Sequence, residues 1–131
     1  MKLLLDTHIW LWSVLAPERL SKRVRALLRS QSNELWLSSV STWELTGLCT
    51  KKRVILDEDV NQWVKKAFSL APLREAPLTH QIALETVNLR LPHRDPADHF
   101  LGATARVMGL TLVTADETLI KARQFAVLPN R

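Results

Sequence analysis

The chain has 131 residues, which is the size of one domain and too short for two ordinary ones. Apolar residues make up 47% and charged residues 24%, a composition typical of a folded globular domain and unlike that of a disordered segment. The three glycines, Gly47, Gly102 and Gly109, exclude the glycine-rich loops that bind dinucleotides or nucleoside triphosphates. A formal charge of +5 favours an anionic partner without identifying it.

A single cysteine, Cys49, excludes an intrachain disulfide and a structural zinc site built from cysteines. The apolar run at the N-terminus is interrupted at Asp6, which argues against a signal peptide. No stretch approaches the roughly 20 apolar residues of a membrane span. We therefore expect a soluble, cytoplasmic protein that does not bind membranes.

Short apolar runs alternate with amphipathic stretches along the chain. In chain order, the pattern predicts a strand at 3–5, a helix after Asp6, a helix at 20–31, a strand at 35–38 and a helix at 42–50. It then predicts a helix capped by Asp57, an edge strand at 73–76, and helices at 79–91 and 97–108. Gly109 ends the last of these, and a strand at 111–114, a helix at 117–123 and a strand at 125–128 complete the chain. This alternation predicts one α/β domain over residues 1–131, a layered sandwich around a mostly parallel sheet.

Carboxylates recur where the predicted strands end. Asp6 directly follows the first strand, Glu44 lies near the start of the helix after the second, and Asp116 follows the strand at 111–114. Asp98 lies in the first turn of the helix after Pro96 and reaches the same edge if that helix packs beside the sheet. Because ligands bind beyond the carboxyl ends of parallel strands, we expect these four acids to gather there.

Each acid also has a simpler explanation as a helix cap, since carboxylates at helix starts accept hydrogen bonds from backbone N–H groups. Ser41–Glu44 fits the capping box S-x-x-E, and Asp95–Asp98 resembles one. Four carboxylates at one edge would nevertheless repel one another and raise their pKa values unless a cation neutralised them. Oxygen ligands of this kind favour Mg²⁺ or Mn²⁺.

Gly102 stands four residues after Asp98, where a side chain would normally cover part of the surface above the acid. The glycine would leave space for a ligand or let the helix pack closely on the sheet, and these two interpretations are compatible. Other catalytic chemistries have no candidate, because the four histidines form no zinc-binding pair and no serine lies in a nucleophile elbow.

Four sequence blocks resemble the signature motifs of PIN-domain ribonucleases, most closely those of VapC-type toxins of type II toxin–antitoxin systems. The blocks are LLLDTHIWLW at 3–12, SSVSTWEL at 38–45, HRDPADHFLGATA at 93–105 and LVTADETL at 112–119. They span nearly the whole chain in the order found in that family. The resemblance implies a three-layer α/β/α PIN-like sandwich with a sheet of four to five strands.

The resemblance also implies an endoribonuclease that uses Mg²⁺, or Mn²⁺, to activate water on an RNA phosphodiester. Its catalytic and metal-binding acids would be Asp6, Glu44, Asp98 and Asp116. Of these, Asp6 and Asp98 would ligate the metal directly and Asp116 directly or through water, while Glu44 would orient water or hold a second ion. The family further implies homodimers and a small antitoxin that covers the site.

Other positions match the family beside these acids. Thr7 and Thr114 match hydroxyl positions next to the pocket and are candidate substrate-binding residues. Asp95 matches an acid that we interpret chiefly as an N-cap. Arg94 is the basic residue nearest the acids in sequence and is the predicted phosphate contact.

An acidic pocket repels RNA, so such a nuclease needs positive charge around it. Basic residues that would provide this charge are Arg19, Lys22, Arg23, Arg25, Arg29, Lys51–Arg53 and Arg94. For Lys22, Arg25 and Arg29 on the predicted helix at 20–31, a solvated helix face is the favoured explanation of the charges.

The five tryptophans have several possible roles besides core packing. Trp10 and Trp12 cannot share one face of a helix, so a dimer interface, an antitoxin interface and base stacking all stay open. Two other functions also stay open: a PIN-fold nuclease with a housekeeping RNA or DNA target, and a non-catalytic basic RNA-binding module. The second leaves the placement of the four acids unexplained.

Overall fold

A computed structural model describes residues 1–92 and 94–131 and contains a five-stranded sheet whose pairings are all parallel. The strands are β1 (Lys2–Leu5), β2 (Glu34–Ser38), β3 (Leu73–Ala76), β4 (Thr111–Thr114) and β5 (Val127–Pro129). They lie in the order β3-β2-β1-β4-β5, so the strand order reverses between β1 and β4. In a parallel sheet, such a reversal leaves a crevice at the carboxyl ends of the two strands.

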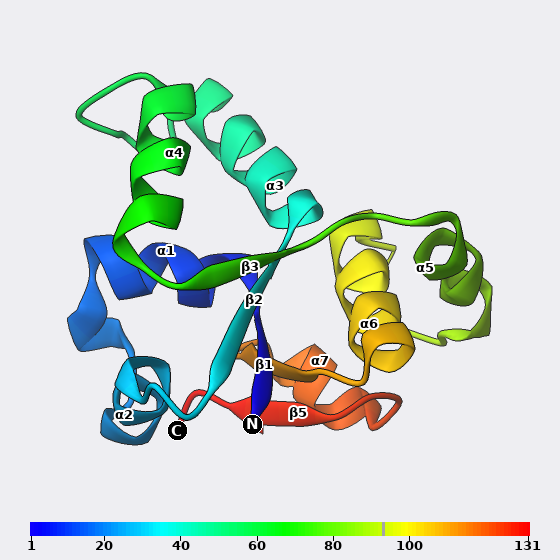
Figure 1. The fold of residues 1–131 in the computed structure, drawn as a ribbon. Coiled ribbons are helices and arrows are strands. Elements are labelled where there is room, and N and C mark those ends of the chain that lie inside the picture. The colour runs from blue at the N-terminus through cyan, green and yellow to red at the C-terminus, as the bar shows by residue number, and fades with distance from the viewer. Residues whose placement is uncertain (93) are drawn as a thin grey trace.

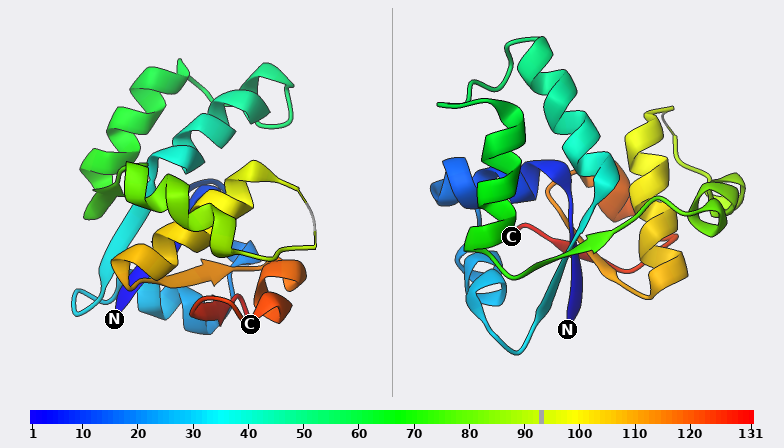
Figure 2. Two further views of the ribbon diagram at one scale, coloured as in Figure 1. Left: turned by 90° about the vertical axis from the view of Figure 1, so that its right-hand side faces the viewer. Right: turned by 45° about the horizontal axis from the view of Figure 1, so that its top comes forward.

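Helices cover both faces of this sheet (Figures 1 and 2). One layer contains α1 (Thr7–Leu15), α2 (Lys22–Arg29), α3 (Ser39–Thr50) and α4 (Val60–Leu70), and the other contains α6 (Pro96–Met108) and α7 (Glu117–Ala122), with α5 (His80–Glu85) packed on α6. Alternate residues of β1 serve the two layers, because Leu3 and Leu5 pack with the first and Leu4 with the second. The predicted three-layer sandwich is confirmed.

Two short 3-10 helices, η1 (Pro17–Arg19) and η2 (Thr86–Asn88), complete the described elements. The predicted helix at 79–91 is too long, since α5 ends at Glu85 and η2 follows it. None of the helices in the described part of the chain is long and apolar enough to cross a bilayer.

Helix starts differ from the predictions where a serine caps earlier or later than expected. The hydroxyl of Ser21 accepts a hydrogen bond from Val24 N, so α2 begins at Lys22. The Ser38 hydroxyl accepts one from Val40 N, and α3 therefore begins immediately after β2.

The predicted capping box at Ser41–Glu44 is consequently wrong, because both residues lie inside α3. The Asp57 cap is also wrong, since α4 begins after Asp59. The start of α6 is as predicted, with the Asp95 carboxylate accepting a hydrogen bond from Ala97 N at 3.1 Å. Its end is as predicted too, at Gly109 with a positive φ of 65°.

Gly102 lets α6 pack closely on its neighbours. A Cβ atom at this position would lie 2.6 Å from Cε1 of Phe125 and 3.1 Å from a methyl carbon of Leu89. The space beside Gly102 is therefore filled by the protein core, and the interpretation that it leaves room for a ligand is wrong.

Candidate active site

A cleft of about 330 Å³ opens beyond the carboxyl ends of β1 and β4, where the strand order reverses. In Figure 1 this is the end of β1 opposite the N-terminus. The residues that line the cleft come from four separate segments: Asp6, His8, Trp12, Glu44, Asp95, Asp98, Ala115 and Asp116. The fold thus brings together all four acids that the sequence singled out, and adds Asp95 as a fifth.

Asp6 is held rigidly between β1 and β4. Its Oδ1 accepts a hydrogen bond from Thr7 N at 2.8 Å, and its Oδ2 accepts one from the Thr114 hydroxyl at 2.6 Å. The side chain is buried, and this burial raises the pKa of Asp6 although the bonds from Thr114 and Thr7 oppose the rise. Two partners, one at the start of α1 and one at the end of β4, therefore fix the orientation of this carboxylate.

Glu44 reaches the cleft from the second turn of α3. Thr7 donates a hydrogen bond from its hydroxyl to Oε1 of Glu44, and the same Thr7 Oγ1 lies 2.9 Å from Oγ of Ser41. Burial raises the pKa of Glu44, and the bond from Thr7 partly offsets that rise. Because Ser38 starts α3 early, Glu44 is free of any capping role and faces the start of α1.

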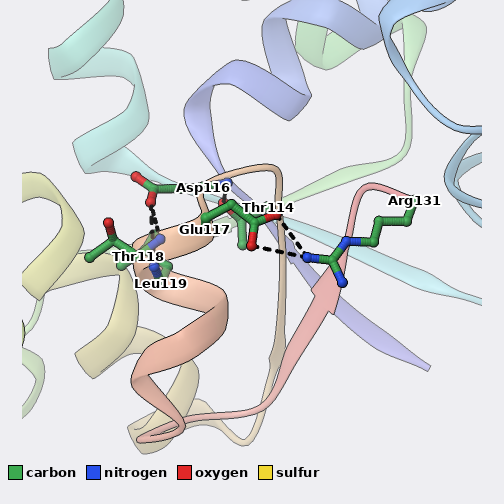
Figure 3. Close-up of polar contacts among 6 residues, drawn as sticks. All are labelled: Thr114, Asp116, Glu117, Thr118, Leu119 and Arg131. Atoms are coloured by element: carbon green, nitrogen blue, oxygen red, sulfur yellow. Dashed lines mark hydrogen bonds and ion pairs between the residues drawn. The ribbon is translucent and has the colours of Figure 1, made fainter.

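Asp116 serves both as a helix cap and as an acid of the cleft (Figure 3). Its Oδ1 accepts hydrogen bonds from Thr118 N at 2.8 Å and Leu119 N at 3.4 Å, while its own backbone N–H donates to Oγ1 of Thr114. The second carboxylate oxygen points away from α7 (Figure 3). Capping and ligand binding are thus compatible at this residue.

Figure 3 also shows an ion pair beside this cap, in which Arg131 contacts both carboxylate oxygens of Glu117 at 2.8 and 3.0 Å. Both side chains are more than half exposed, so the pair contributes little to stability. It nevertheless engages Glu117, the acid that follows Asp116 in the chain.

Asp98 lies in the first turn of α6 and is only 7% exposed. Burial raises the pKa of Asp98 to about 8, and the negative charges of the surrounding acids add to the rise, in decreasing order Asp95, Asp6, Asp116 and Glu44. The cleft therefore concentrates negative charge that a bound cation would neutralise.

The hydroxyls predicted beside the pocket lie behind the acids. Thr7 and Thr114 are buried, and they bond Glu44 and Asp6 respectively. Arg94 is exposed, and it is not among the described residues that line the cleft. His8 and Trp12 do line it, which the sequence analysis did not predict; their four-residue spacing on the helix after Asp6 was the available signal.

The residues of the cleft fit a hard divalent cation by their donor chemistry. Carboxylate oxygens that raise one another's pKa values favour a small doubly charged ion, and Mg²⁺ is commonly held by one or two carboxylates while it keeps several waters. Within residues 1–92 and 94–131, no three histidine, cysteine or acidic side chains are arranged to enclose a metal ion.

Comparison with known proteins gives a consistent result. The PIN domain family model matches residues 3–124. Ribonuclease VapC22 of Mycobacterium tuberculosis is 32% identical over 117 residues, which is 88% of each chain. The fold resembles VapBC2 from Rickettsia felis bound to a promoter DNA fragment (TM-score 0.73, 18% identity, 98% of each chain) and FitAcB from Neisseria gonorrhoeae (TM-score 0.69, 23% identity, 98% and 97% of the two chains). The chain belongs to the PIN-domain family.

Proposed function

We propose that the protein is a Mg²⁺-dependent endoribonuclease and the toxin of a toxin–antitoxin pair. The observation that carries this proposal is the meeting of Asp6, Glu44, Asp98 and Asp116 in one cleft at the reversal of strand order. A relative that is 32% identical bears the name of a VapC ribonuclease, which supports the same activity. We further propose that residues 1–131 act as one domain in the cytoplasm.

The acids have distinct roles in this proposal. A divalent cation bound here supplies Lewis acidity and makes a coordinated water more acidic. Asp6 and Asp98 would hold the ion, and Asp116 would bind it directly or through water, through the oxygen that points away from α7. Glu44, whose Oε1 accepts a hydrogen bond from Thr7, would orient a water molecule through its other oxygen or hold a second ion.

The buried threonines position the acids. Thr114 bonds both the Asp6 carboxylate and the backbone N–H of Asp116, so a single hydroxyl links two acids of the cleft. Thr7 links the start of α1 to Glu44 in α3. We propose that these hydroxyls fix carboxylate geometry, and that Arg94 contacts RNA outside the cleft.

Cleavage assays test this function. Wild-type protein should cut RNA with Mg²⁺ and lose this activity when a chelator is added, whereas Asp6→Asn and Asp98→Asn should remain folded and inactive. Asp57→Asn is the matched control, because it removes an exposed carboxylate remote from the cleft. Cleavage of DNA alone would favour a DNA target, and RNA binding without cleavage would favour the non-catalytic module.

Two partners belong to the proposal. An apolar groove of about 340 Å³ lies between α1, α2 and α4 and is lined by Trp10, Val14, Leu28 and Leu70, among others; it suits an apolar segment of an antitoxin. Trp43 is 61% exposed and lies beside the small hollow formed by Val40, Leu78 and Phe100, which suits a homodimer contact.

Sedimentation of the wild type and of Trp43→Ser tests the dimer. We expect the wild type to sediment as a dimer at micromolar concentration and the variant to dissociate. A short reading frame next to the gene, whose product blocks cleavage when the two are co-expressed, would identify the antitoxin.

A further inference from the structure

The side chains of Arg19, Trp12 and His8 lie next to one another at the cleft, and His8 and Trp12 line it. The guanidinium carbon of Arg19 lies 4.4 Å from the centroid of a Trp12 ring. The His8 and Trp12 ring centroids are 5.9 Å apart, with the rings tilted by 55°. His8 and Trp12 lie four residues apart on α1 and both line the cleft, whereas Arg19 comes from η1. The contact with Trp12 therefore places the cationic guanidinium of Arg19 next to the rim of the acidic cleft.

The backbone of Arg19 is tied to the same edge of the sheet as the acids. Its carbonyl accepts a hydrogen bond from Nδ2 of Asn130 at 3.0 Å, and Asn130 N donates to the carbonyl of Thr114 at 2.8 Å. Oδ1 of Asn130 also accepts a bond from Ser21 N, just after η1. Asn130 thus connects η1 directly to the end of β4, whose Thr114 hydroxyl bonds Asp6.

The guanidinium of Arg19 is available to an external anion. The side chain is exposed, and it forms no ion pair with a carboxylate in the part of the chain that the structure describes. Stacking on an indole uses the flat face of a guanidinium and leaves its in-plane N–H donors free. The Trp12 ring has both Arg19 and His8 as neighbours.

We propose that Arg19, held in place by Trp12, binds the RNA phosphate adjacent to the phosphate that is cleaved. This inference rests on the proposed function, and it assigns a substrate-positioning residue to the same site. Five acids around the cleft repel the RNA backbone, so a cation in a fixed position at the rim compensates that repulsion for one neighbouring phosphate. The bound species is a single strand of RNA, contacted through its backbone without regard to base sequence.

Binding of a non-cleavable probe tests the proposal. The probe is a fluorescent single-stranded 2′-O-methyl oligoribonucleotide of mixed sequence, and its affinity is measured by anisotropy with Mg²⁺ over a range of KCl concentrations. Arg19→Ala should weaken binding about tenfold, as expected for one charge-assisted contact. It should also reduce the slope of log Kd against log salt by about 0.7, the value for one phosphate of a single strand.

Two further variants separate this contact from general positive charge. Arg123→Ala removes an exposed arginine at the end of α7 that has no aromatic partner among the described residues, and it should leave affinity and slope near wild type. Arg19→Lys should restore the slope without restoring full affinity, because an ammonium lacks the flat face and the fork of donors of a guanidinium. Unchanged binding by Arg19→Ala, an equal loss in Arg123→Ala, or no binding of the probe by the wild type would each overturn the proposal.

Cleavage of unmodified RNA by the wild type, measured in parallel, keeps the two proposals separate. If binding depends on Arg19 but no RNA is cleaved, the phosphate contact stands and the nuclease proposal fails. If RNA is cleaved but binding does not depend on Arg19, only the present inference fails.

Discussion

Asp6 and Thr114 form the contact on which the acidic cleft depends. They end two neighbouring parallel strands, and the bond between them lies where the strand order reverses. Through its hydroxyl, Thr114 also accepts from Asp116 N, so the positions of two acids follow from one buried side chain. At this scale the cleft is a set of carboxylates that threonine hydroxyls hold in place, with burial opposing their ionisation.

Thr114→Val is expected to disturb the site while keeping its shape, because valine fills the same volume without the hydroxyl. It leaves Oδ2 of Asp6 and the Asp116 N–H without their bond, which should cost about 1–3 kcal/mol in the free energy of unfolding and lower RNA cleavage. Thr104→Val is the matched control, since the buried Thr104 hydroxyl bonds Phe100 O within α6. RNA cleavage is measured for both variants, and denaturant unfolding gives the stability of each. An equal loss of cleavage in the two variants would contradict a specific role for Thr114.

Asp98→Asn is expected to stabilise the metal-free protein. The pKa of Asp98 is raised to about 8 in the folded protein, above its value in the unfolded chain, so the folded state binds more protons between those two pKa values. Stability should therefore fall as pH rises from about 4 to 8. The variant, which carries no charge at position 98, should lose the part of this dependence that Asp98 contributes, while the raised pKa values of Asp6 and Glu44 keep the rest. Thermal unfolding of both proteins in the presence of a chelator, at several pH values, measures this pH dependence of stability. A wild-type melting temperature that rises between pH 5 and 8 would contradict the assignment.

At the scale of elements, helix starts decide which side chains reach the cleft. Ser38 starts α3 directly after β2, and this places Glu44 one turn further along the helix than the Ser41–Glu44 pattern suggested. Asp95 caps α6 and thereby sets Asp98 in its first turn. The position of α6 itself depends on Gly102, where Phe125 and Leu89 approach the backbone.

Gly102→Ala should displace α6 and with it Asp98. The added Cβ would lie 2.6 Å from the Phe125 ring, and relieving such a contact in a packed core costs about 1–3 kcal/mol. Gly47→Ala is the control, because its added Cβ would meet nothing within 4 Å beyond the adjoining residues and backbone of its own helix, and alanine favours the middle of a helix by about 1 kcal/mol. Urea unfolding should therefore show opposite signs for the two variants. A Gly102→Ala protein as stable as the wild type would indicate that Phe125 moves aside freely.

At the scale of the whole molecule, the sequence predicts the sheet well and the site in part. The strands are short, dense apolar runs between helices, so their parallel arrangement and the edge where Asp6 and Asp116 lie follow from chain order. Glu44 was predicted as an acid of the site with capping as the simpler alternative, because the local pattern at 41–44 competes with Ser38, and only the fold decides between the two helix starts. The contact of Arg19 with Trp12 depends on η1 packing against α1. The hydrophobic pattern of the sequence does not predict this tertiary contact.

Mg²⁺ should stabilise the whole molecule, because the acids that would bind it lie on both sides of the point where the strand order reverses, between β1 and β4. Asp6 follows β1, Asp116 follows β4 and Asp98 belongs to α6, so an ion bound between them joins segments that separate on unfolding. Binding to the folded state alone raises stability by about 2.7 kcal/mol at a concentration 100 times Kd. We expect MgCl₂ to raise the melting temperature of the wild type, and NaCl of equal ionic strength to leave it nearly unchanged. Asp6→Asn should abolish the MgCl₂ effect and Asp57→Asn should retain it; an equal response of both variants would show that the ion binds elsewhere.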